Sequence, residues 1–174
     1  MTTEEVLMAV TGSRGEHLRQ YHREHREFID QAMGSGHNHQ AWVGGYRAHL
    51  EQFFALALSI GKVFTVEFIG SMKEVPWESV VLVGYFHDIE KMHKYSDLSN
   101  VEPWRSTRFD KDNYLRFVLR DRWGIILTEE ELDAIKYVHG EGDDYRKDRR
   151  VMSPLAALCH MADVGSARIL FDVK

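Results

Sequence analysis

The feature that most restricts the fold is an apolar run that ends in two ionisable residues. The segment VVLVGYFHDIEKMHKYS, residues 80–96, predicts a buried helix whose inner end carries His87 and Asp88. An imidazole and a carboxylate both lose hydration at such a position, and a buried polar group without a partner is costly. The fold must therefore supply these two side chains with a strong partner.

The rest of the chain predicts an all-α protein. Only three prolines occur, and apolar residues recur at spacings of three and four. Thr128 and Glu131 have the spacing of a capping box, and Ser153 precedes a proline at a typical N-cap position. We expect a glycine-flanked loop over 34–45, a turn at Gly124, an irregular segment over 96–109, and helices over 15–33, 46–64, 77–86, 111–122, 128–139 and after residue 153.

Length and charge indicate one globular domain. The 174 residues suffice for one substantial core, with an N-terminal helical segment (1–36) and a motif-bearing core (37–170). A net charge of -5 argues against a stable nucleic-acid complex and against a polybasic membrane anchor. No apolar run approaches the roughly 20 residues that cross a bilayer. Cys159 has no internal disulfide partner and no signal peptide is visible, so we expect a cytoplasmic protein.

Histidines stand out, because there are ten of them. A single histidine at a helix end is more often a satisfied core residue than a ligand, but a set on apolar helix faces favours a divalent metal, whose charge offsets the desolvation of its ligands. His160 and Asp163 are three residues apart and share a helix face. The candidate ligands are His49, His87, Asp88, His139, His160 and Asp163.

Other histidines favour simpler explanations. His17, His22 and His25 lie on the strongly charged segment RGEHLRQYHREHREF, and we expect their side chains to be solvated. His93 in KMHKY is equally compatible with an exposed turn.

The order of the candidate ligands resembles the H…HD…D signature of the HD superfamily of metal-dependent phosphohydrolases. HNHQAWVGGYRAH resembles the opening motif of HD-type bacterial 3'-5' exoribonucleases and of small phage-encoded HD proteins. HDIEK resembles their HD-x-G-K motif, and VHGEG with SPLAALCHMAD resembles their closing motifs. The resemblance implies a compact HD-domain helical bundle, in the host cytoplasm if the chain is phage-encoded.

The resemblance also implies roles for the ligands. His49, His87, Asp88 and Asp163 would hold one ion, His139 and His160 would add a second, and Asp88 would bridge the two. Mn, Fe, Co, Ni and Mg all remain open as the metal. Glu90 departs from the family, where many relatives have glycine; it changes the lip of the pocket, serves as an acid near the metal-bound water, or is a tolerated surface residue.

Cationic and aromatic residues are candidates for substrate binding. Lys91, three residues after Asp88, is the first choice for a phosphate contact. The arginines of the loop 141–152 are the second choice, although a solvated charged turn explains them equally well. His39 and Trp42 lie in the glycine-flanked loop and join the substrate-binding set, while Trp42, Tyr46 and Tyr95 either stack on a base or belong to the core. The loop candidates are Arg146, Lys147, Arg149 and Arg150.

These residues favour hydrolysis of a nucleotide or deoxynucleotide phosphate, with Asp88, Lys91 and Glu90 as catalytic candidates. Three alternatives stay open: an HD-fold di-iron oxygenase that acts on a small molecule, a 3'-5' exonuclease or phosphodiesterase, and a degenerate HD domain that only binds a nucleotide or a partner protein. Many relatives form homodimers, although no sequence feature here identifies a contact surface.

Overall fold

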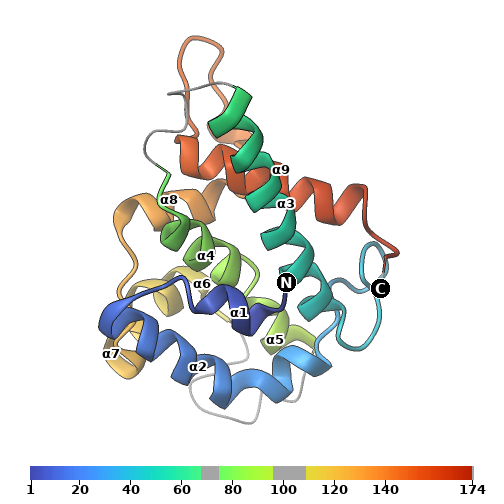
Figure 1. Ribbon diagram of the computed structural model, residues 1–174, viewed down its shortest axis with the longest axis vertical. Coiled ribbons are helices and arrows are strands. Elements are labelled where there is room, and N and C mark those ends of the chain that lie inside the picture. The colour runs from blue at the N-terminus through green and yellow to red at the C-terminus, as the bar shows by residue number, and fades with distance from the viewer. Residues whose placement is uncertain (68–74, 96–108, 174) are drawn as a thin grey trace.

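The computed structural model describes residues 1–67, 75–95 and 109–173, and every regular element within these ranges is helical (Figure 1). This confirms the all-α prediction. The elements are α1 (Thr3–Leu7), α2 (Gly12–Gln31), α3 (Gly45–Glu67), α4 (Trp77–Phe86), α5 (Glu90–Tyr95), α6 (Lys111–Asn113), a π-helical turn (Tyr114–Val118), α7 (Leu119–Trp123), α8 (Glu129–Tyr137), a 3-10 turn (Gly142–Asp144) and α9 (Pro154–Arg168).

The local signals for helix ends are confirmed. The Thr128 hydroxyl and the Glu131 carboxylate form the reciprocal capping box of α8, and the Ser153 hydroxyl accepts a hydrogen bond from the backbone of Ala156. Gly124 ends α7 with a φ of 67°, which a glycine adopts without strain. The helix α1 was not predicted, and the helix expected over 111–122 is interrupted by the π-helical turn. Of the segment 96–109, only Phe109 lies within the described residues.

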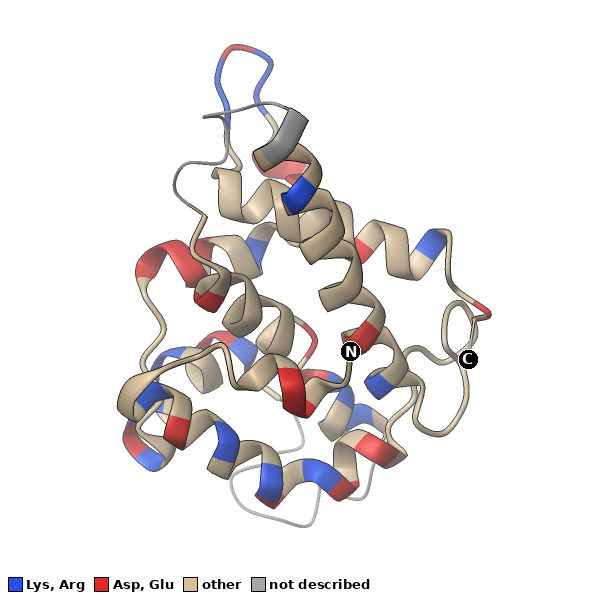
Figure 2. Cartoon of the chain, in the orientation of Figure 1, with Lys and Arg blue, Asp and Glu red and all other residues tan. Residues whose placement is uncertain are grey.

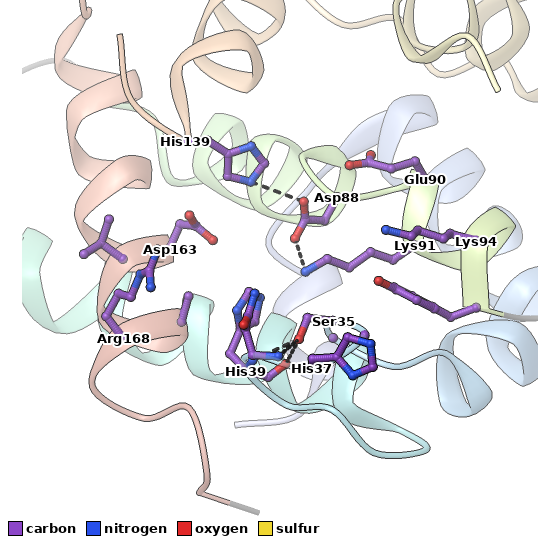
Figure 3. A pocket seen from close by; sticks show the side chains of 16 residues that line it. Ser35, His37, His39, Asp88, Glu90, Lys91, Lys94, His139, Asp163 and Arg168 are labelled. Carbon is purple, nitrogen blue, oxygen red and sulfur yellow. Dashed lines mark hydrogen bonds and ion pairs between the residues drawn. The ribbon is translucent and has the colours of Figure 1, made fainter. Parts of the chain in front are cut away.

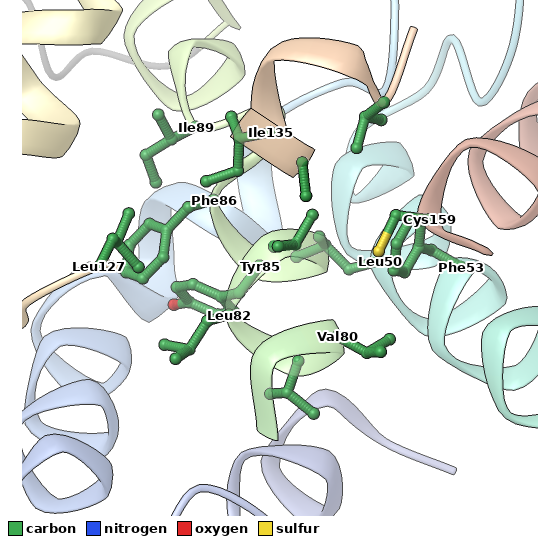
Figure 4. Close-up of a cluster of buried hydrophobic side chains, with 14 of the residues drawn as sticks. Leu50, Phe53, Val80, Leu82, Tyr85, Phe86, Ile89, Leu127, Ile135 and Cys159 are labelled. Atoms are coloured by element: carbon green, nitrogen blue, oxygen red, sulfur yellow. The ribbon is translucent and has the colours of Figure 1, made fainter. Parts of the chain in front are cut away.

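The helix α4 lies at the centre of the core. Every residue from Val80 to Phe86 is buried, and α4 packs against α3, α8 and α9 (Figure 4). A β-carbon at Gly84 would collide with the rings of Phe53 and Phe54, so this glycine permits the close approach of α4 to α3. From Val80 onward the helix is therefore buried on all sides, and the residues that follow it emerge inside the protein.

Two of the three histidines expected to be solvated are buried instead. His22 and His25 are each 6% exposed, because this side of α2 packs against the aromatic rings of Tyr85 and Trp123. One ring nitrogen of each has a partner: His22 Nδ1 lies 3.0 Å from the Tyr85 hydroxyl, and His25 Nδ1 lies 2.9 Å from the carbonyl oxygen of Tyr21. His17 is exposed, as expected. Because charged residues separate these histidines in the sequence, the sequence pattern did not reveal that one face of α2 is buried.

Charged residues are distributed along the helices and concentrated in the loop 145–150, which projects from one end of the molecule (Figure 2). No helix in the described ranges is long and apolar enough to cross a membrane.

Candidate metal centre

Three parts of the chain converge on one polar point within the core. His49 lies near the start of α3, His87 and Asp88 form the turn between α4 and α5, and Asp163 lies in α9. The backbone N–H of His87 still donates to Val83, so this residue caps α4. Because α9 packs on both α3 and α4, Asp163 is brought to the end of α4. A helix end in the core is the arrangement predicted from the sequence.

The four side chains present their ligand atoms to one another. One ligand atom from each of His49, His87, Asp88 and Asp163 lies within 4.8 Å of the other three, and all four residues are buried. His49 Nε2 lies 3.2 Å from Asp163 Oδ1 and 3.2 Å from His87 Nε2, and His87 Nε2 lies 3.3 Å from Asp88 Oδ2. Two imidazoles and two carboxylates at this spacing are able to coordinate a metal ion.

Surrounding hydrogen bonds select which nitrogen of each histidine faces this point. The Ser166 hydroxyl donates its only hydrogen to Gln52 Oε1 at 2.9 Å, so it must accept from His49 Nδ1, which lies 2.9 Å away. His87 Nδ1 lies 2.7 Å from the carbonyl oxygen of Gly84, which only accepts. Both Nδ1 atoms therefore carry hydrogen, and each Nε2 is directed at the other ligands. Such outer partners fix the tautomer and ring orientation of metal-binding histidines.

A buried glutamine holds this arrangement in place. Gln40 Nε2 donates to Gln52 Oε1 at 2.7 Å and to the carbonyl oxygen of Ser166 at 3.2 Å. Gln40 has a φ of 43°, a value that costs a non-glycine residue energy, and it is fully buried. The glycine-flanked loop, the start of α3 and the end of α9 are thus joined directly behind His49.

The pKa values describe how charge is balanced in the metal-free protein. Burial lowers the pKa of His49 to about 4, so its imidazole is neutral. Burial also opposes protonation of His87, but Asp88 and Asp163 outweigh it and raise the pKa to about 9. Burial would raise the pKa of Asp88, yet His87 and Lys91 hold it well below its usual range. The imidazolium of His87 and the ammonium of Lys91 therefore balance two carboxylates, a charge that a divalent ion would also supply.

A pocket of about 610 Å³ opens onto the four-residue group (Figure 3). Its volume lies within the range of small-molecule sites. Asp88 and Asp163 form part of its wall, the loop 34–39 forms another side, and α5 contributes Lys91, Lys94 and Tyr95. Arg168 from the end of α9 lies on the side opposite α5 (Figure 3). Three cationic side chains thus line a pocket that reaches the candidate metal ligands.

The two ligands predicted for a second ion differ in position. His139 follows the end of α8, lines the pocket, and places its Nε2 3.3 Å from Asp88 Oδ1, the oxygen not directed at His87. His160 Nδ1 lies 2.6 Å from the carbonyl oxygen of Val138, so its Nε2 is also free of hydrogen when the ring is neutral. His160 does not belong to the group of four and does not line the pocket. Its role as a ligand stays a prediction.

The predicted catalytic residues Lys91 and Glu90 both line the pocket. Lys91 Nζ lies 2.5 Å from Asp88 Oδ2. Glu90 Oε2 instead lies 3.2 Å from Lys111 Nζ, and Lys111 also donates to the carbonyl oxygen of His87. Glu90 is therefore paired with Lys111, and its role as an acid stays a prediction.

The predicted substrate-binding residues separate into two groups. His39 lines the pocket, and its ring centroid lies 5.6 Å from that of His49. Tyr95 also lines it, whereas Tyr46 is a core residue. Trp42 and the arginines of the loop 141–152 do not line this pocket. The three arginines of this loop are exposed: Arg146, Arg149 and Arg150. Arg146 donates instead to the carbonyl oxygens of Asp143 and Tyr145.

Several contributors were missed by sequence reasoning. Lys94 lies one helical turn after Lys91, so its place on the pocket side of α5 was readable from the spacing. Arg168 lies five residues after Asp163, and no spacing rule joins the two. Ser166 and Gln52 lie on different helices, and only the packing of α9 on α3 brings them to His49.

Comparison of the chain with protein-family models, with curated proteins and with solved structures finds no match. The resemblance to the HD superfamily therefore rests on the motifs alone.

Proposed function

We propose that this protein is a metal-dependent phosphohydrolase that acts on a nucleotide or deoxynucleotide phosphate. The observation that carries the proposal is a single pocket with two kinds of lining. Its lining includes two carboxylates of the buried His/Asp group, Asp88 and Asp163, and also three cationic side chains: Lys91, Lys94 and Arg168. Cations arranged around a metal group suit an anionic substrate better than a neutral one.

Each residue would have a part in this function. A divalent ion bound there would supply an activated water and polarise a phosphoryl oxygen. His49, His87, Asp88 and Asp163 would hold it, and His139 together with His160 would serve a second ion. Arg168 offers a planar pair of donors that fits two phosphate oxygens, and Lys91 and Lys94 offer point charges from the opposite wall. His39 and Tyr95 provide flat surfaces in the same pocket for a base.

The experiment is a turnover assay with a panel of substrates. Metal-free protein is resupplied with Mn²⁺, Co²⁺, Mg²⁺ or Fe²⁺ and offered ribo- and deoxynucleotides with one to three phosphates, cyclic nucleotides and a short oligonucleotide. Products are separated by chromatography, and bound metal is counted by mass spectrometry. Asp88→Asn removes a ligand charge at constant size, and Asp121→Asn, an exposed carboxylate paired with Arg120, is the matched control.

Metal-dependent release of phosphate or pyrophosphate that Asp88→Asn abolishes and Asp121→Asn retains would support the proposal and name the leaving group. Degradation of the oligonucleotide alone would favour the exonuclease. No turnover of the panel by protein that contains two irons and consumes O₂ would refute hydrolysis and favour the oxygenase.

A further inference from the structure

We propose that Lys91 is the counterion of Asp88 until a metal ion binds, and that metal binding releases the Lys91 ammonium into the pocket to hold an anionic substrate. The inference rests on the proposed metal-dependent function, which it extends: it assigns to one side chain a coupling between metal binding and substrate binding. A lysine that only bound substrate would act on the metal through screened repulsion alone, and its loss would change the affinity for the metal little.

The first observation is the contact of Lys91 in the metal-free protein. Lys91 lies in the first turn of α5, and its backbone N–H donates to the carbonyl oxygen of Asp88 at 2.9 Å. Its side chain turns back toward the same residue and brings Nζ to 2.5 Å from Asp88 Oδ2. The Lys91 side chain is only 12% exposed and the Asp88 side chain 4%. Burial from water makes this charge-assisted contact strong.

The second observation is which oxygen of Asp88 the ammonium occupies. The same Oδ2 lies 3.3 Å from His87 Nε2 and 3.5 Å from His49 Nε2, within the group that could coordinate a metal. The other oxygen, Oδ1, is directed at His139. An ion held by His49, His87 and Asp88 would use the oxygen that Lys91 already neutralises. The ion and the ammonium carry like charge, so their repulsion at one carboxylate oxygen would drive the ammonium away from Asp88.

The third observation is the space available to the displaced ammonium. Lys91 lines the pocket together with Lys94 and Arg168, and its side chain extends from α5 along the pocket wall to reach Asp88 (Figure 3). Its flexible four-carbon stem allows the ammonium to leave Asp88 without movement of the backbone. A released ammonium adds its charge to those of Lys94 and Arg168 in the lining. Binding of a phosphate by that cation would in turn favour the state with metal, since coupling between two sites is reciprocal.

Lys94 provides the matched control. It has the same charge, lies one helical turn along α5 and lines the same pocket. Its Nζ lies 5.0 Å from the centre of the Tyr95 ring, and it makes no ion pair with Asp88 within the described part of the chain. Loss of Lys94 removes a pocket charge without freeing a metal ligand.

The test measures metal and anion binding separately by calorimetry. Chelator-treated wild type, Lys91→Met, Lys91→Arg and Lys94→Met are titrated with Mn²⁺, and the Mn²⁺-loaded proteins are then titrated with inorganic phosphate. Lys91→Met should bind Mn²⁺ roughly tenfold more tightly, since the competing charge-assisted contact is gone, and should bind phosphate roughly tenfold more weakly. Lys91→Arg retains the charge and should stay near wild type in Mn²⁺ affinity. Circular dichroism checks that each variant is folded.

Opposite changes of the two affinities in Lys91→Met, with an unchanged Mn²⁺ affinity in Lys94→Met, would support the inference. Equal Mn²⁺ affinities in wild type, Lys91→Met and Lys94→Met would overturn it and leave the phosphohydrolase proposal standing. Failure of every variant and of wild type to bind Mn²⁺, Co²⁺ or Fe²⁺ would refute the metal centre itself, and the inference with it.

Discussion

Replacement of Ser166 by alanine should weaken metal binding while the helical fold persists. The Ser166 hydroxyl is the acceptor for His49 Nδ1–H at 2.9 Å, and its own hydrogen is committed to Gln52. Without it, the imidazole of His49 is free to rotate or to carry its hydrogen on Nε2, which would block coordination. Loss of such an outer partner reduces metal affinity by about 10- to 100-fold, which corresponds to about 1.4–2.7 kcal/mol.

The structure limits the damage to His49. Gln52 Oε1 keeps the donor Gln40 Nε2 at 2.7 Å, so alanine does not leave this oxygen without a partner. The free energy of unfolding of the metal-free protein should fall by about 1–3 kcal/mol if His49 Nδ1–H loses its acceptor. A change of tautomer would relieve that loss, at the expense of the metal.

The assay is calorimetric titration of chelator-treated protein with Mn²⁺, together with thermal unfolding with and without the metal. Ser166→Thr retains a hydroxyl and should recover most of the affinity. Ser59→Ala, on the same α3 helix as His49, removes a hydroxyl that donates only to its own helix backbone and serves as the control. A Ser166→Ala protein that is folded and binds Mn²⁺ within twofold of wild type would refute the tautomer argument.

Three further predictions concern the fold and the candidate metal centre. Gly84→Ala should lower the free energy of unfolding by about 1–3 kcal/mol, because the added methyl group collides with the rings of Phe53 and Phe54. A denaturant titration measures this change, and an unchanged midpoint would contradict the packing of α4 on α3. Acid should destabilise the protein through His25, because burial lowers the pKa of its imidazole in the folded state. Below about pH 6.5 the unfolded chain therefore binds more protons than the folded protein. The contribution of His25 to the free energy of unfolding is fully present above that pH and decreases below it. His25→Phe should flatten this slope in unfolding curves measured between pH 7 and 5, and an equal slope in both proteins would exclude His25 as the cause. Removal of the metal with a chelator should lower the melting temperature, since an ion at 100 times its dissociation constant stabilises the folded state by about 2.7 kcal/mol. The melting temperature of Asp88→Asn should not change with the chelator. A decrease as large as that of wild type would place the ion elsewhere.

Much of the fold was readable from the sequence because its signals are local. Thr128 with Glu131 and Ser153 with Ala156 are separated by one helical turn, so the residues that end a helix stand beside it in the chain. His87 and Asp88 were also found from a local signal, because they directly follow an apolar run and so indicate a helix end within the core. The inward faces of α2 were misread at His22 and His25, because the surrounding charges outnumber the apolar residues that mark the buried side.

The sequence by itself determined an all-α chain and a short set of histidines and aspartates able to hold a metal. Tertiary structure decided which of them meet. His49, His87, Asp88 and Asp163 come together because α9 packs on α3 and α4, whereas His160 does not belong to the group. Packing also brought Ser166 behind His49 and Arg168 to the pocket, and it kept the loop arginines out of the lining. Spacing along a chain specifies neighbours on one helix, but contacts between helices depend on how their faces fit, and that fit is a property of the whole core.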